Sequence, residues 1–181
     1  MIKSEVRTKA KKARELVLNK PLKDKAIFDA LFKLLEKIEY STVFIYLSFG
    51  TEVDTKAIVD KLFKLGKTVC VPIIVDGKMK SVKIDKNTEF VINDYGIKEP
   101  ILEEELLPDL AIVPMVAFNE DCYRVGYGKG YYDRYFSSIN CDVLKIGVAY
   151  EEQKVCGFDI DEYDVPCDII ITDDKIYGEL K

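Results

Sequence analysis

The sequence contains no histidine, and this absence narrows its possible chemistry more than any other feature of its composition. Serine–histidine–aspartate triads, cysteine–histidine pairs and metal sites built on imidazole are all excluded. Any catalysis must therefore use carboxylates, lysine, arginine, tyrosine, main-chain donors or a hard metal ion.

Cysteine is present only as five scattered residues, with no C-x-x-C pair. An odd number at irregular spacing indicates neither a disulfide framework nor a zinc site. Long apolar runs are also missing: none approaches the roughly 20 residues that a membrane span requires, and the first residues do not resemble a signal peptide. We therefore expect a cytoplasmic protein with no membrane partner.

The formal net charge is −5, so the chain lacks the excess of positive charge that nucleic-acid binding requires. No nucleic-acid partner is expected. The charge is uneven, because the first 25 residues are strongly basic and residues 151–174 are acidic. The length of 181 residues predicts a single domain, 1–181, large enough to bury a core. The oligomeric state is left open, with a monomer favoured.

Apolar periodicity predicts alternating helices and strands. Helices are expected at residues 3–19, 22–38 and 58–66, strands at 42–47, 68–74, 110–115, 143–150 and 169–171, and a hairpin turn at Asp76-Gly77. The order strand, loop, helix, strand over residues 42–74 is a βαβ unit, which predicts an α/β fold with a parallel sheet. Ligands of such sheets bind beyond the carboxyl ends of the strands, where residues 47–52 fall.

The most informative stretch is residues 124–135, R-V-G-Y-G-K-G-Y-Y-D-R-Y, in which three glycines alternate with other residues and Lys129 lies among them. Glycines so placed indicate unusual dihedrals or a partner against the bare backbone. The run follows a predicted strand and precedes a predicted helix start, so its N–H groups could bind an anion. Asp133, in the first turn of that helix, could hold Mg²⁺. The alternative is a tight turn with close packing, because the pattern is neither a Walker A loop nor a dinucleotide fingerprint.

Basic residues recur on one face of the first predicted helix, at Lys3, Arg7, Lys11 and Arg14. Such a face is most often simply solvated. The functional alternative is that Lys3, Arg7 and Arg14 reach phosphates bound at the glycine loop.

As a whole, the block from Pro108, P-D-L-A-I-V-P-M-V-A-F-N-E-D-C-Y-R-V-G-Y-G-K-G-Y-Y-D-R-Y, resembles the signature of the 5-formyltetrahydrofolate cyclo-ligases, also called methenyltetrahydrofolate synthetases. The resemblance implies one three-layer α/β/α domain with a mostly parallel central sheet, as in phosphosugar isomerases and CoA transferases. It also implies ATP-dependent cyclisation of 5-formyltetrahydrofolate to 5,10-methenyltetrahydrofolate, with release of ADP and phosphate. The partners would then be ATP and 5-formyltetrahydrofolate, with Mg²⁺ as the cofactor.

The same resemblance implies a set of site residues. Lys129 and Arg124 would be catalytic. ATP would contact Lys3, Arg7, Arg124, Gly126, Tyr127, Gly128, Lys129, Gly130, Tyr131 and Tyr132. The folate would contact Leu47, Glu52, Tyr127, Gly128, Lys129, Gly130 and Tyr131. Asp133 and Asp164 would bind the metal, and Tyr163 stands where the family often has histidine.

Plainer alternatives exist for several of these residues. Glu52 could be a first-turn residue favoured by the helix dipole, and the acidic residues around Asp164 could form a solvated turn. The tyrosines near residue 131 could serve packing alone. For the whole protein, the alternatives are a nucleotide- or folate-sensing module without turnover and another enzyme on the same architecture.

Overall fold

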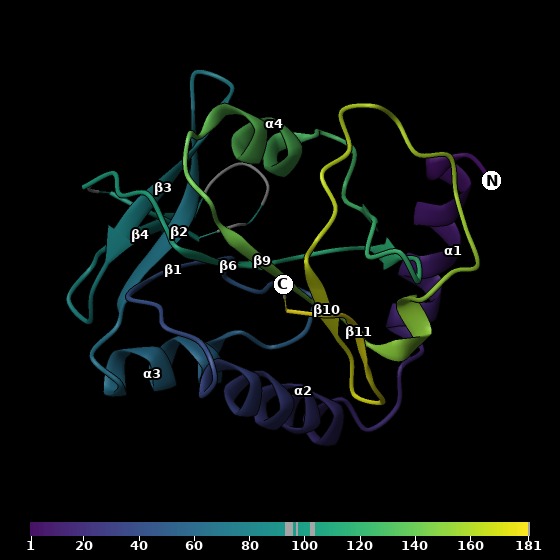
Figure 1. The fold of residues 1–181 in the computed structure, drawn as a ribbon, viewed down its shortest axis with the longest axis horizontal. Coiled ribbons are helices and arrows are strands. Elements are labelled where there is room, and N and C mark those ends of the chain that lie inside the picture. Colours follow the sequence, from purple (N-terminus) through teal and green to yellow (C-terminus); the bar gives the residue numbers. More distant parts are fainter. Residues whose placement is uncertain (93–95, 97, 102–103, 181) are drawn as a thin grey trace.

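The computed structural model describes residues 1–92, 96, 98–101 and 104–180, and within them the chain forms an α/β domain (Figure 1). Its elements are α1 (Lys3–Glu15), α2 (Lys20–Leu35), β1 (Thr42–Ile45), α3 (Lys56–Lys64), β2 (Thr68–Val75), β3 (Lys78–Ile84), β4 (Phe90–Ile92), β5 (Lys98–Pro100), β6 (Leu110–Val113), β7 (Ala117–Phe118), β8 (Arg124–Val125), α4 (Tyr131–Ser138), β9 (Leu144–Val148), the 3-10 helix η1 (Glu151–Gln153), β10 (Ile169–Ile171) and β11 (Ile176–Gly178).

In this described part of the chain, seven strands form the central sheet in the order β11-β10-β9-β6-β1-β2-β3. The five inner strands are parallel, and the edge strands β11 and β3 run antiparallel to their neighbours. The predicted parallel sheet and its βαβ unit, β1-α3-β2, are confirmed. The antiparallel edge strand β11 was not predicted.

The sheet is covered on both faces, as a three-layer α/β/α domain requires. Figure 1 shows α2 and α3 along one face and α4 on the opposite face. Strand β1 supplies both cores by alternation, because Val43 and Ile45 pack with Leu31 of α2 while Phe44 packs with Tyr135 of α4. The predicted fold class is therefore confirmed.

The first two helices differ from the predicted bounds. The predicted helix 3–19 ends at Glu15, and the predicted helix 22–38 begins at Lys20 and ends at Leu35. Leu16 is the C-cap of α1, and Asn19, with a φ of 55°, is the N-cap of α2, so the two helices are separate. Val17 lies beyond the end of α1 but is still buried. Its place in the apolar pattern therefore made the predicted helix too long. At the other predicted turn, Asp76 and Gly77 both have positive φ and join β2 to β3 as expected.

The connection between β6 and the glycine stretch also differs from the prediction. A hairpin of two-residue strands, β7 and β8, intervenes, so the glycines do not follow β6 directly. Val6 and Ala10 of α1 pack against this hairpin at Val116, Ala117 and Val125. The hairpin therefore fixes α1 beside the glycine loop. No helix in the described residues is long and apolar enough to cross a bilayer.

Candidate active site

The candidate site lies where the order of the strands reverses. The chain moves from β1 to β2 on one side and later returns to β6 on the other side of β1, so the carboxyl ends of β1 and β6 flank the reversal point. Open α/β sheets bind their ligands at such a point. The loop after β1 (residues 47–55) and the glycine loop (residues 126–130) meet here, because the Tyr127 hydroxyl donates to Glu52 Oε1 at 2.5 Å.

Two of the three loop glycines are explained by backbone conformation. Gly128 has a φ of 103° and Gly130 a φ of 63°, both in regions that favour glycine. Gly126 has neither a positive φ nor any atom within 4 Å of the position that a Cβ would take. Its lack of a side chain is therefore not required by the protein itself.

The main chain of the glycine loop is open to a ligand. Within the described residues, no backbone N–H from residue 126 to residue 133 donates a hydrogen bond. Gly130 is the N-cap of α4, so the first-turn N–H groups of that helix point toward the same region. Unpaired N–H groups at a helix start form an anion site.

Cationic side chains surround this loop. Arg7 Nε donates to the Gly126 carbonyl oxygen at 2.8 Å, and a Cβ on Gly128 would lie 3.3 Å from the Arg7 Cζ. Lys129 is exposed and makes no ion pair in the part of the chain that the structure describes. Lys11 Nζ lies 5.2 Å from the centre of the Tyr127 ring. The basic face of α1 is thus turned toward the glycine loop rather than simply solvated.

Arg124 has a different setting from the other cations, because its side chain is only 4% exposed. Its Nη2 donates to Asp133 Oδ1 at 2.8 Å, and its Nη1 donates to the carbonyl oxygen of Val165. The Val165 N–H also donates to Asp133 Oδ1, at 3.2 Å. Arg124 therefore holds α4 against the segment that carries Asp164.

The two predicted metal ligands are brought close together by these contacts. Asp133 accepts the N–H of the residue that follows Asp164, while Asp164 Oδ2 accepts from Lys3 Nζ at 2.5 Å and from the Asp161 N–H at 2.7 Å. The second oxygen of each carboxylate accepts no hydrogen bond within the described residues. No cluster of three or more possible metal ligands occurs in that part of the chain. Mg²⁺ usually takes only one or two carboxylates besides phosphate and water, so this donor pair fits it.

The three neighbouring tyrosines have separate surroundings. Tyr127 is 40% exposed, and its ring centre lies 6.0 Å from that of Phe49. Tyr132 points into the core beside Phe44, at 6.0 Å, and its burial raises its pKa. Tyr131 packs against the Arg134 guanidinium at 5.2 Å. Tyr127 is therefore the member that joins the glycine loop to the loop after β1.

Glu52 is the acidic group of the second loop. Its Oε2 accepts the Phe49 N–H at 3.1 Å, and its Oε1 accepts from Tyr127. Burial raises the pKa of Glu52, while these hydrogen bonds and the Arg14 charge act in the opposite direction. Leu47, from the same loop, packs against the core beneath α2 and α3. The structure thus brings together Glu52, Tyr127, Arg7 and the glycines, as predicted for one site.

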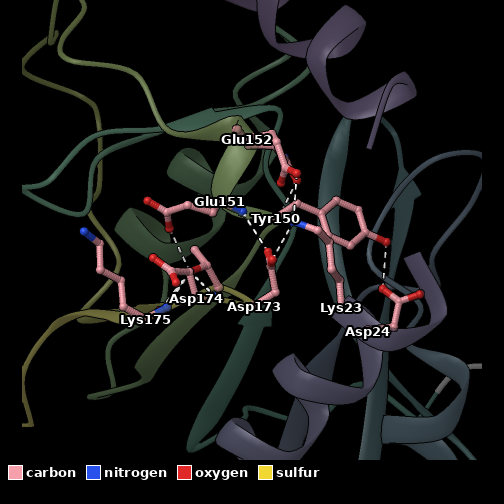
Figure 2. Close-up of polar contacts among 10 residues, drawn as sticks. Lys23, Asp24, Tyr150, Glu151, Glu152, Asp173, Asp174 and Lys175 are labelled. Atoms are coloured by element: carbon pink, nitrogen blue, oxygen red, sulfur yellow. Dashed lines mark hydrogen bonds and ion pairs between the residues drawn. The ribbon is translucent and has the colours of Figure 1, made fainter. Parts of the chain in front are cut away.

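The loop after β1 is also held from the side of α2, by residues that the sequence did not single out. In Figure 2 the Tyr150 hydroxyl points at Asp24, donating to Oδ1 at 2.7 Å, and it lies 3.4 Å from the Glu52 carbonyl oxygen. Burial raises the pKa of Asp24, and the Tyr150 hydrogen bond opposes that rise. This cluster fixes the start of α2 against the carboxyl ends of β9 and β10.

Lys23 completes the same cluster. Its Nζ bridges Glu152 Oε1 at 2.7 Å and Asp173 Oδ2 at 2.6 Å (Figure 2). Asp173 Oδ1 in turn accepts the Glu151 N–H at 2.9 Å. Glu152 and Asp173 are thus engaged in contacts within the protein, and we interpret them as supporting the site rather than as ligand-binding residues.

Two hollows border α2. One of about 400 Å³ is lined by α2 and residues 172–176, and one of about 390 Å³ by α2 with Asp54 and Ala57. Neither reaches the glycine loop.

An α/β domain with a bare, cation-flanked loop at the reversal point of a parallel sheet defines a class of enzymes that bind anionic substrates at that edge. The family model described as the 5-formyltetrahydrofolate cyclo-ligase family matches residues 1–173. The chain therefore belongs to the 5-formyltetrahydrofolate cyclo-ligase family, and it is an enzyme of that family.

Individual relatives agree with this assignment. The chain is 32% identical over 145 residues to the 5-formyltetrahydrofolate cyclo-ligase of Escherichia coli K12, covering 75% of this chain and 80% of that protein. The solved structure of 5,10-methenyltetrahydrofolate synthetase from Aquifex aeolicus superimposes with a TM-score of 0.84 at 29% identity, over 98% of this chain and 93% of that one. The synthetase from Mycoplasma pneumoniae gives a TM-score of 0.77 at 28% identity, over 96% and 99% of the two chains.

Proposed function

We propose that this enzyme cyclises 5-formyltetrahydrofolate to 5,10-methenyltetrahydrofolate, using ATP and releasing ADP and phosphate. One observation carries the proposal beyond family membership. The loop with unpaired N–H groups, suited to phosphate, is joined through Tyr127 to Glu52, in the loop that resembles the folate-contacting segment of the family. The ATP site and the folate site would therefore be neighbours, joined by the hydrogen bond between Tyr127 and Glu52.

The chemistry requires both substrates in one place because a formamide oxygen is a poor leaving group. Transfer of the γ-phosphoryl group of ATP to that oxygen gives an imidate-like phosphate and ADP. N10 of the folate then attacks the formyl carbon, the C–O bond breaks and the oxygen leaves with the phosphate. N10 releases its proton to the departing phosphate or to water as the ring closes. Such a transfer depends on positioning and charge neutralisation, so a site without histidine can perform it.

The glycine loop would supply those needs. We assign the N–H groups of Gly126, Gly128 and Gly130 to the phosphates and Lys129 to the charge that develops on transfer. Arg124 would act on the same charge and also holds Asp133 in place. Lys3 and Arg7 would complete the ATP site, with Tyr131 and Tyr132 at its edge.

Asp133 and Asp164 are the residues that would hold Mg²⁺. When bound, the ion neutralises phosphate charge and orients the transferred group. Each carboxylate already has a cationic partner, Arg124 for Asp133 and Lys3 for Asp164. On the folate side, Leu47 would line the pterin pocket, Glu52 would hydrogen-bond the pterin, and Tyr127 would contact both substrates.

The direct test is an absorbance assay for methenyltetrahydrofolate, with phosphate release measured in parallel. We expect product only when ATP, Mg²⁺ and 5-formyltetrahydrofolate are all present. Binding of both ligands without turnover would instead indicate a sensing module. Turnover of a different substrate without methenyl product would indicate another enzyme on this architecture.

Two further features are also proposals. We place the enzyme in the cytosol, in keeping with five cysteines that are all free thiols. We also propose a monomer, with neither nucleic acid nor membrane as a partner, which sedimentation at micromolar concentration would test.

A further inference from the structure

Arg14 is a second deeply buried cation near the site, with 5% of its surface exposed. Each nitrogen of its guanidinium contacts a different segment of the chain. Nε donates to Thr51 Oγ1 at 3.0 Å, Nη2 to the Tyr127 hydroxyl at 2.9 Å and Nη1 to the Met115 carbonyl oxygen at 3.3 Å. A planar group with fixed donor directions is suited to holding three partners at once.

These three partners are the segments that build the site. Thr51 directly precedes Glu52 in the loop after β1, Met115 follows β6, and Tyr127 belongs to the glycine loop. Met115 is itself fixed, because its carbonyl oxygen also accepts from the buried Gln153 at 2.9 Å. The guanidinium therefore ties both loops to the segment that follows β6.

Resting on the function proposed above, we propose that Arg14 is a positioning residue that sets Glu52 and Tyr127 in their productive relation before the folate binds. It does so through the protein, since each of its three guanidinium nitrogens donates to a protein acceptor. When these groups are already ordered, folate binding does not carry the free-energy cost of ordering them. Loss of Arg14 should therefore weaken folate affinity.

Charge adds a second consequence. The groups facing Glu52 are Arg14 from α1, Tyr127 from the glycine loop, Tyr46 after β1 and Tyr132 from α4. Among them Arg14 is the cation, and it opposes the rise in the pKa of Glu52 that burial causes. Loss of the Arg14 charge should move the protonation of Glu52 to higher pH.

The experiment compares wild type with Arg14→Lys and Arg14→Gln, using Lys12→Met, an exposed neighbour on α1, as the control. For Arg14→Lys we expect the KM and calorimetric Kd for 5-formyltetrahydrofolate to rise about tenfold or more, as for loss of charge-assisted hydrogen bonds. The KM for ATP should stay within about twofold. In Arg14→Gln, the acid limb of the kcat/KM profile should also move to higher pH. Lys12→Met should match wild type throughout.

Thr51→Val tests one contact without exposing the guanidinium, so it decides the matter if the Arg14 variants fail to fold. A rise of about two- to fivefold in folate Kd is expected, together with a modest fall in melting temperature, because the buried Arg14 Nε–H loses its acceptor. Unchanged folate Kd in Thr51→Val or Arg14→Lys would overturn the positioning role, as would an equal loss of affinity for both substrates. If the wild type makes methenyl product while these variants bind folate normally, only this inference fails. A wild type that neither binds 5-formyltetrahydrofolate nor forms product would overturn the proposed function and this inference together.

Discussion

Gly126 offers the sharpest test of the glycine loop, because the protein itself gives no reason for a glycine there. Its φ is outside the left-handed region, and a Cβ would meet no atom within 4 Å. Gly126→Ala should therefore leave the fold intact and raise the free energy of unfolding by about 0.4–1 kcal/mol, since alanine restricts the unfolded chain. If phosphate fills the open space, however, the added methyl group should impede ATP.

The expected loss of ATP affinity follows from the cost of an extra methyl group in a packed site, about 1–3 kcal/mol, which corresponds to roughly 5- to 150-fold. Gly128→Ala is the matched contrast. Its φ of 103° and the 3.3 Å approach to Arg7 predict strain of about 1–3 kcal/mol in the folded state itself. Gly157→Ala, at an ordinary φ in open space, is the control for both measurements.

Urea denaturation would give the stabilities, and initial rates of methenyl formation would give the KM for ATP. Gly126→Ala should be slightly more stable than wild type but poor in ATP use, whereas Gly128→Ala should lose stability as well. Wild-type KM for ATP in Gly126→Ala would refute the reasoning, because the space beside Gly126 would then hold no part of the nucleotide.

Three further predictions concern single contacts. Lys129→Ala should lower turnover by about 10²–10³ with an unchanged melting temperature, because this exposed residue makes no ion pair within the described residues; wild-type turnover would contradict its role. Tyr150→Phe should lower the free energy of unfolding by about 1–3 kcal/mol by removing the hydroxyl donor of Asp24, which then keeps only the longer contact with the Asp54 N–H, at 3.4 Å. The pKa of Asp24 is already raised by burial, so this deficit should shrink as pH falls through that raised value, as urea curves at several pH values would show. Burial lowers the pKa of Lys3, but the hydrogen bonds to Asp161 and Asp164 outweigh it and raise the pKa above 10.5. The Lys3→Met variant should therefore lose a constant amount of stability up to pH 10.5. This difference from wild type should vanish as the pH rises through the raised pKa of Lys3.

Local signals in the sequence predicted the parts of the fold that depend on near neighbours. The βαβ unit, the Asp76-Gly77 turn and the start of α4 after Gly130 are all set by periodicity or by a left-handed residue within a few positions. The β7–β8 hairpin was missed because strands of two residues are too short to show a period. The early end of α1 was missed because Val17 stays apolar and buried after the helix has stopped.

The site was predicted as a set of residues but not as a network. The proximity of Glu52, Arg7 and the glycine loop follows from motif and topology, and their roles stay predictions. Arg14 carried the same periodic signal as its exposed neighbours, so its burial could not be read from spacing. Its partners lie 37, 101 and 113 positions away, and only the folded chain brings them together.

The ion pair between Lys3 and Asp164 joins residues 161 positions apart. Contacts of such long sequence separation form late, because the intervening chain must first be ordered. During synthesis, a ribosome-bound chain that has not yet extruded Asp164 has its glycine loop but lacks one side of the proposed ATP site. ATP binding should accordingly report on the completion of folding, and the nucleotide should give little help to the emerging chain.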